Sequence, residues 1–155
     1  MSLVSENRFV MGAVPVDINA AGANSDYINM GKVDKGVFVL QFGTSGAAAA
    51  VTLTQATTAA GTTSKALAFT KYYTNIGLAT DALTAATATS NTFNTAATAN
   101  NMYIIPVDAR DLDTANGYCV VRINVADPSA AAVCGILFVG DSGRYMESSP
   151  PSLVS

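Results

Sequence analysis

The sequence predicts an all-β protein, a sandwich or barrel built from antiparallel strands. About eight or nine short apolar segments, rich in β-branched residues, follow one another along the chain. Gly, Pro, Asn and Asp separate these segments, and no segment shows a convincing long helical period. The length of 155 residues fits one domain and can bury a core without disulfides or metals.

The N-terminal part of the chain is expected to contain four strands. Segments 10–18 and 26–30 are short, β-branched and bounded by Gly, Asn and Asp. Segment 36–43 is a continuous apolar run between glycines, which favours a buried strand over a helix. Segment 50–56 alternates apolar residues with threonine, so it predicts a strand with one buried face and one face of hydroxyl groups.

The middle of the chain, residues 44–100, is unusually rich in Ala and Thr. Such a composition could indicate disorder, but apolar and aromatic residues recur through it, and disordered segments are poor in these. We expect short strands around 67–76 and 90–95, joined by long Ala/Thr-rich loops. Segment 80–88 could form a helical turn with Leu83 pointing inward.

Three further strands are expected in the C-terminal part, at 101–107, 117–125 and 131–140. The Asp-Pro-Ser turn between the last two predicts that they form an antiparallel hairpin. In that hairpin Cys119 and Cys134 would lie about 13 Å apart. A disulfide requires Cα atoms within about 7 Å, so both cysteines are expected to be reduced.

Three aspartates, Asp108, Asp111 and Asp113, stand close together before the last hairpin. An EF-hand loop does not fit, because its third ligand position falls on Ala115 and its twelfth on Arg122. A looser calcium site built from the three aspartates remains open, since calcium accepts flexible sets of oxygen ligands.

A structural interpretation explains this aspartate segment better. Pro106 would end the preceding strand, and Asp108 would cap a short turn over 109–115. Asn116 and Gly117 tolerate positive φ and would direct the chain into the next strand. We therefore expect a capped corner here and no metal site.

Composition argues against enzymatic and nucleic-acid functions. The chain has no histidine, the commonest general base, and no nucleophile motif. We predict no catalytic, cofactor-binding or metal-binding residues; a carboxylate pair such as Asp111 with Asp141 has no more than background support. The Lys and Arg residues are scattered and the net charge is −3, which disfavours nucleic-acid binding. The apolar runs are too short for a membrane helix, and the N-terminus lacks the apolar stretch of a signal peptide.

The small share of charged residues also indicates how the surface of the protein is used. Only 12% of the residues are charged, about half the share in ordinary soluble domains. Part of the surface is therefore expected to be covered by neighbouring proteins; the alternative is a neutral, threonine-rich monomer. Arg122, in mid-strand, would either be solvated or form a salt bridge to a neighbouring subunit. The expected organisation is an arm at 1–8, a β-sandwich domain at 9–145 and an extended tail at 146–155.

Several segments together resemble a known family. They are "NRFVMGAVPVDI", "GANSDYINM", "VTLTQATTAAGTTSKAL", "DARDLDTANGYCVVRINVADP" and "GRYMESSPPS". In this order they look like the small decoration, or cement, proteins of tailed bacteriophage heads. The resemblance implies a jelly-roll-like antiparallel β-sandwich, a homotrimer, and attachment to the outer surface of an icosahedral capsid where major capsid protein subunits meet. It carries over no catalytic motif.

The expected function is therefore that of a structural virion protein, made in the host cytoplasm. It would cement adjacent major capsid protein subunits against the pressure of packaged DNA. The alternatives are a head-fibre or tail-associated virion module, and a carbohydrate-binding jelly-roll module. The chain shows neither the repeats nor the long helical stalk common in the first class. The second would need aromatic platforms on exposed loops, but the chain has no Trp and most Tyr fall within predicted strands.

Overall fold

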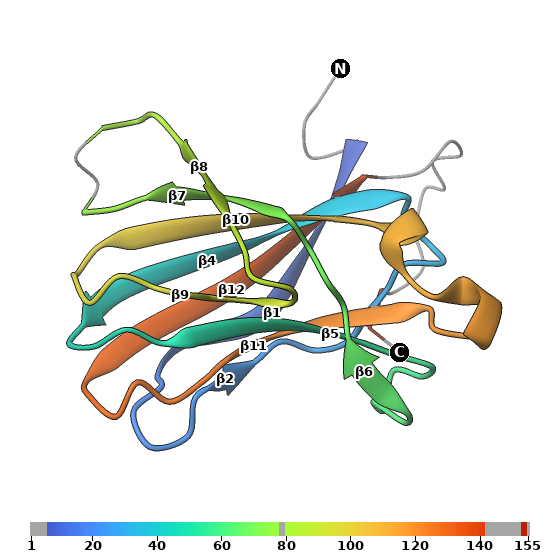
Figure 1. Ribbon diagram of the computed structural model, residues 1–155, viewed down its shortest axis with the longest axis horizontal. Coiled ribbons are helices and arrows are strands. Elements are labelled where there is room, and N and C mark those ends of the chain that lie inside the picture. The colour runs from blue at the N-terminus through green and yellow to red at the C-terminus, as the bar shows by residue number, and fades with distance from the viewer. Residues whose placement is uncertain (1–5, 78–79, 142–152, 155) are drawn as a thin grey trace.

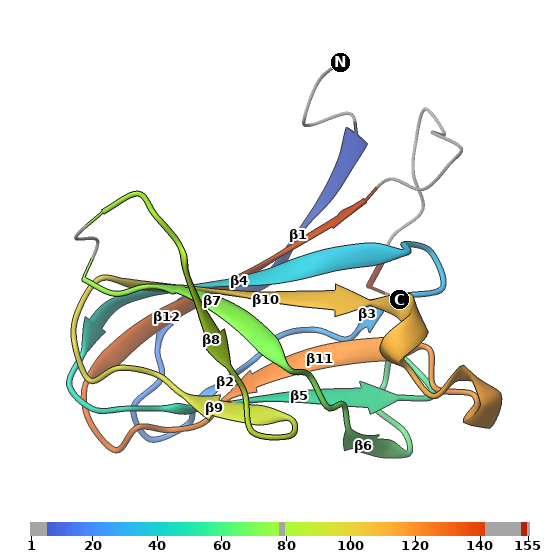
Figure 2. The same ribbon diagram turned by 45° about the horizontal axis from the view of Figure 1, so that its top comes forward.

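Two antiparallel β-sheets packed face to face form the protein (Figures 1 and 2). The computed structural model describes residues 6–77, 80–141 and 153–154. Each sheet has six strands, and every strand pair is antiparallel. The prediction of an all-β antiparallel sandwich is confirmed.

The first sheet, sheet A, has the strand order β1-β12-β4-β10-β7-β8. Its strands are β1 (Asn7–Asp17), β4 (Lys35–Ser45), β7 (Lys71–Asn75), β8 (Thr84–Thr87), β10 (Asn101–Asp108) and β12 (Ala132–Asp141). The second sheet, sheet B, has the order β2-β11-β5-β6, with β3 also paired to β11 and β9 to β5. Its strands are β2 (Ala23–Asn24), β3 (Ile28–Asn29), β5 (Ala50–Ala56), β6 (Ser64–Ala66), β9 (Thr92–Asn94) and β11 (Val120–Val125).

The core lies between the sheets, where alternate residues of each strand point inward. Phe38 of β4 and Phe138 of β12 are directly paired and fully buried, with ring centroids 5.0 Å apart. Leu53 of β5 and Ile123 of β11 face them from sheet B and are also buried. The period-two pattern predicted for segment 50–56 is thus the pattern that fills this core.

The predicted hairpin between segments 117–125 and 131–140 is wrong. β11 pairs with β5 in sheet B, whereas β12 pairs with β4 and β1 in sheet A. Residues 126–131 therefore cross from one sheet to the other. An Asp-Pro-Ser turn fits such a crossing as well as a hairpin, and β4 offers β12 a longer apolar partner than β11 does.

The cysteine argument rested on that hairpin, and its register does not exist. Both cysteines are nevertheless free. Cys134 is fully buried, while Cys119 is partly exposed with its Sγ 3.4 Å from the Thr57 carbonyl oxygen. Cys134 lies in β12 of sheet A, and Cys119 lies just before β11 of sheet B. The two cysteines are therefore separated because they belong to different sheets, not because of their spacing along one hairpin.

The helical turn expected at 80–88 is also wrong. Residues 84–87 form β8, which pairs with β7 at the edge of sheet A. Leu83 does not point inward; its side chain is exposed. Threonine is β-branched and therefore favours a strand over a helical turn. The open edge of the neighbouring β7 supplies the hydrogen-bond partners that this strand needs.

The aspartate corner folds largely as predicted. Asp108 accepts a hydrogen bond from the Arg110 backbone N–H and caps a 3-10 turn, η1 (Ala109–Asp111). A second turn, η2 (Thr114–Asn116), ends at Gly117, whose φ is 82°. Pro106 was expected to end its strand, but that expectation is wrong: β10 continues for two more residues, to Asp108.

The pairing around Pro106 explains why the strand continues. β7 pairs only with residues 102–104 of β10, so no neighbour on that side requires the N–H that Pro106 lacks. On the other side Pro106 lies opposite Val37 of β4. The proline is therefore tolerated within a strand that is unpaired on one side at this point.

Both ends of the chain contact the sandwich where they are described. β1 begins at Asn7, two residues before the expected start of the domain. Leu153 is buried in the core, and its carbonyl oxygen accepts a hydrogen bond of 2.9 Å from the Asn29 N–H. The rest of the predicted arm and tail, residues 1–5, 146–152 and 155, lies outside the described residues.

Candidate interaction surface

The outward side of sheet A is apolar from one strand to the next. Two rows of directly paired residues cross it, and paired residues in a sheet share a face. The first row is Phe9, Val139, Val37 and Pro106; the second is Met11, Leu137, Val39, Ile104 and Tyr73. We call these residues the apolar face.

Within the described chain, no other layer covers the apolar face (Figure 2). Phe9 and Met11, on the edge strand β1, are 47% and 64% exposed. Val14, later on the same strand, is exposed as well; Val16 is also exposed, but it pairs with the buried Cys134 and so lies on the other side of the sheet. Soluble monomers seldom leave a contiguous apolar surface of this kind in water, so such a surface marks an interaction site.

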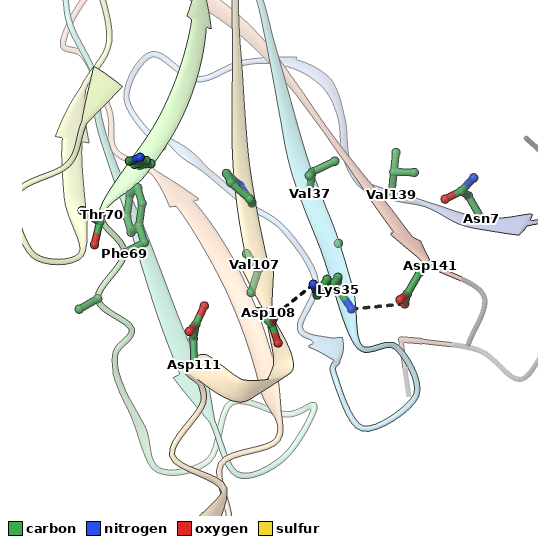
Figure 3. A pocket seen from close by; sticks show the side chains of 14 residues that line it. Asn7, Lys35, Val37, Phe69, Thr70, Val107, Asp108, Asp111, Val139 and Asp141 are labelled. Atoms are coloured by element: carbon green, nitrogen blue, oxygen red, sulfur yellow. Dashed lines mark hydrogen bonds and ion pairs between the residues drawn. The ribbon is translucent and has the colours of Figure 1, made fainter. Parts of the chain in front are cut away.

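A hollow of about 740 Å³ opens at one end of the apolar face (Figure 3). Val37 and Val139 form part of its wall, together with Phe69 from the segment before β7. The rim is polar. Lys35 and Asp141 lie on it, and the Asp141 carboxylate accepts a hydrogen bond of 3.3 Å from the Lys35 backbone N–H.

The three aspartates considered for calcium do not form one site. Asp108 and Asp111 line the hollow. Asp113 points elsewhere: its carboxylate accepts hydrogen bonds from Lys65 and from the Asn116 side chain. These contacts, that from Lys65 first, hold the pKa of Asp113 below its usual value.

No group of three or more acidic, cysteine or histidine side chains suited to a metal ion occurs in the described parts of the chain. Asp108 lies 3.9 Å from the Lys35 ammonium and 3.7 Å from the Arg110 Nε. Asp141, mentioned with Asp111 as a carboxylate pair, lines the same hollow and accepts the backbone N–H of Asp34 at 3.0 Å. These contacts hold the rim and the corner in place.

The outward side of sheet B differs sharply from the apolar face. Thr52, Thr54, Arg122 and Asn124 alternate with its buried residues. The Arg122 guanidinium lies 4.6 Å from the centre of the Tyr27 ring, a cation–π contact. Arg122 makes no ion pair with any residue that the structure describes, and its Nε is buried without a hydrogen-bond partner there.

Sequence analysis did not identify the apolar face, although the signal was present. Segments 36–43 and 131–140 are apolar at nearly every position, not at every second position. A strand of this kind needs cover on both sides. The core supplies one cover, and the described chain supplies none for the outer side of Val37, Val39, Leu137 and Val139.

Fold and surface together define a β-sandwich domain with one apolar outer face and one polar outer face. No family model and no curated protein sequence matches the chain. No helix within residues 6–77, 80–141 and 153–154 has the length and apolar character required to span a membrane.

Two solved structures align with this chain at low sequence identity. The SPBc2 prophage-derived protein YomS aligns with a TM-score of 0.45 and 10% identity, over 87% of this chain and 94% of that one. A structure of Clostridium thermocellum endo-1,4-β-D-xylanase 10B, comprising CBM22-1 and GH10 modules with xylohexaose, aligns with a TM-score of 0.38 and 7% identity. That alignment covers 94% of this chain and 28% of the xylanase chain.

Proposed function

We propose that this protein is a non-enzymatic structural virion protein that binds the outer surface of an icosahedral phage capsid. As a homotrimer, it cements adjacent major capsid protein subunits. The observation that carries the assembly of this protein with other chains is the uncovered apolar face on a chain with only 12% charged residues. A protein of this kind acts by being covered by other proteins. The sequence resemblance to head decoration proteins supplies the identity of the partner.

The mechanism is mechanical. Packaged DNA pushes the shell outward, and a protein bound across two capsid subunits must be released before they separate. Each contact needs only modest affinity, because several linked sites on one oligomer raise the total strongly. Binding to the intact shell alone also stabilises that shell by mass action.

Co-sedimentation with bare capsids tests this function. Capsids lacking the protein are mixed with increasing amounts of it and pelleted. We expect saturable binding at a fixed ratio to the major capsid protein, and a higher temperature of DNA release from decorated heads. Capsids that already carry the protein are the control and should take up no more.

Protein that stays in the supernatant at all concentrations would contradict capsid attachment. Binding with no change in the temperature of DNA release would contradict the cementing role and leave attachment intact. A glycan array supplies the comparison with the carbohydrate-binding alternative. Glycan binding without capsid binding would favour that alternative.

A further inference from the structure

The two outer faces of the sandwich are chemically opposite. The apolar face of sheet A carries no charged side chain within its two rows. The outer side of sheet B carries threonine, asparagine and Arg122. Only one of these faces is stable in water without cover.

We propose that the apolar face, with the exposed residues of β1, is the contact between copies of this chain. The inference rests on the homo-oligomer within the proposed function and names the surface that forms it. The occupant of the face is a second copy of the protein, not the capsid.

Timing and chemistry favour a second copy. A capsid partner binds late, so its contact surface must remain stable in water beforehand. Interfaces between independently soluble partners are about as apolar as ordinary protein surface, whereas those between permanent identical copies are more apolar. A face whose paired rows are almost entirely aliphatic or aromatic belongs to the second kind.

The available area is sufficient. β4 has 11 residues. At about 3.4 Å per residue it spans about 37 Å, and four strands spaced about 4.8 Å apart span about 19 Å. The whole outer side of β1, β12, β4 and β10, which comprises the two apolar rows and the polar residues beside them such as Lys35 and Gln41, therefore has a flat footprint of about 700 Å², and side chains standing off the sheet add to it. A stable interface buries about 800 Å² on each partner.

Charged side chains lie around the edge of the face, and one of them, Lys71 of β7, is exposed two residues from Tyr73 on the same side of the sheet. Lys35 and Asp108 are 3.9 Å apart, and Asp141 accepts backbone N–H groups at its own end of the sheet. These groups lie at the rim, outside the two apolar rows. Each copy can therefore pack this face against its neighbours around the three-fold axis of the proposed trimer without burying an unpaired charge at the centre, which would be strongly unfavourable.

Charge insertion on each face, followed by light scattering after size-exclusion chromatography, tests the inference. Met11→Glu places one carboxylate on the apolar face, at a side chain already 64% exposed, so folding should be retained. Leu137→Glu places one at the centre of the second row. Thr52→Glu on the outer side of sheet B is the matched control. Circular dichroism verifies the fold of each variant.

We expect the wild type and Thr52→Glu to be oligomeric. Met11→Glu should raise the dissociation constant between copies by about tenfold or more while remaining folded. An oligomer that tolerates both Met11→Glu and Leu137→Glu would overturn the inference, whatever the result for Thr52→Glu, and leave the proposed homo-oligomer standing. A monomeric wild type would remove the homo-oligomer itself, while capsid co-sedimentation would still report separately on attachment.

Discussion

Gly36 shows at the scale of one residue how tightly β4 and β12 pack. A Cβ atom added there would lie 2.3 Å from Cζ of Phe138 and 3.0 Å from the carbonyl oxygen of Val139. Phe138 is fully buried and cannot move aside freely. Gly36 thus makes room for the ring at the centre of sheet A, and its φ lies outside the left-handed range.

Gly36→Ala should lower the free energy of unfolding by about 1–3 kcal/mol, the usual cost of overpacking a core. Gly43→Ala is the control on the same strand, because an added Cβ there meets nothing within 4 Å. That change should be neutral or stabilising by up to about 1 kcal/mol, since alanine loses less entropy than glycine in a strand. Urea unfolding of both variants checks the pair; equal effects would contradict the steric account.

The two cysteines should differ in reactivity. Burial raises the pKa of the Cys134 thiol to about 12. The thiolate is the reactive species, and a raised pKa leaves less of it at any pH below that value. Cys119 is partly exposed.

At about pH 8, iodoacetamide should therefore alkylate Cys119 in the native protein and leave Cys134 unmodified. Peptide mass spectrometry reads the two sites separately. In guanidinium chloride both should react at similar rates. Rapid native alkylation of Cys134 would mean that the core around β12 opens readily.

At the scale of elements, an aromatic cluster joins the two sheets at the Ala/Thr-rich middle of the chain. Phe93 of β9, in sheet B, stacks on Tyr72 of β7, in sheet A, with ring centroids 3.9 Å apart. It also lies 5.5 Å from the ring of Tyr103 and 6.2 Å from that of Phe69. This cluster adds side-chain packing between the sheets to the backbone pairing of β7 with β10 and of β9 with β5.

Phe93→Ala should lower the free energy of unfolding by about 3–5 kcal/mol, because it removes a buried ring and leaves a cavity. Leu83→Ala, at a side chain that is 44% exposed, should change it by no more than about 0.5 kcal/mol. Chemical denaturation measures both. A small effect of Phe93→Ala would show that residues 67–95 fold independently of this cluster.

At the scale of the whole molecule, an oligomer held by the apolar face should respond to temperature more than to salt. Raising the salt concentration from about 0.1 M to about 1 M shortens the Debye length from about 10 Å to about 3 Å. This weakens ionic contacts but not apolar ones. Cooling weakens apolar contacts.

Sedimentation velocity across salt and temperature measures this response. We expect the oligomer to persist at high salt and to dissociate more readily near the freezing point than at room temperature. Dissociation driven by salt alone would point to ionic contacts between copies, with Arg122 the first residue to test.

Strands could be predicted where the local pattern was sufficient. Segments 36–43, 50–56 and 101–107 each coincide closely with an observed strand. The corner between Asp108 and Gly117 followed from side-chain capping and glycine conformation, which are local properties. Segment 80–88 failed because its conformation depends on the open edge of β7, which the local sequence does not describe.

By itself, the sequence determined that this protein is an all-β sandwich with little charge and with strands that are apolar on both sides. Tertiary structure alone decided that β11 and β12 belong to opposite sheets and that the outer sides of β1, β12, β4 and β10 join into one uncovered face. The physical reason is that alternation and turn chemistry act within a few residues. Sheet pairing and surface continuity depend on residues more than a hundred positions apart, such as Phe9 and Val139.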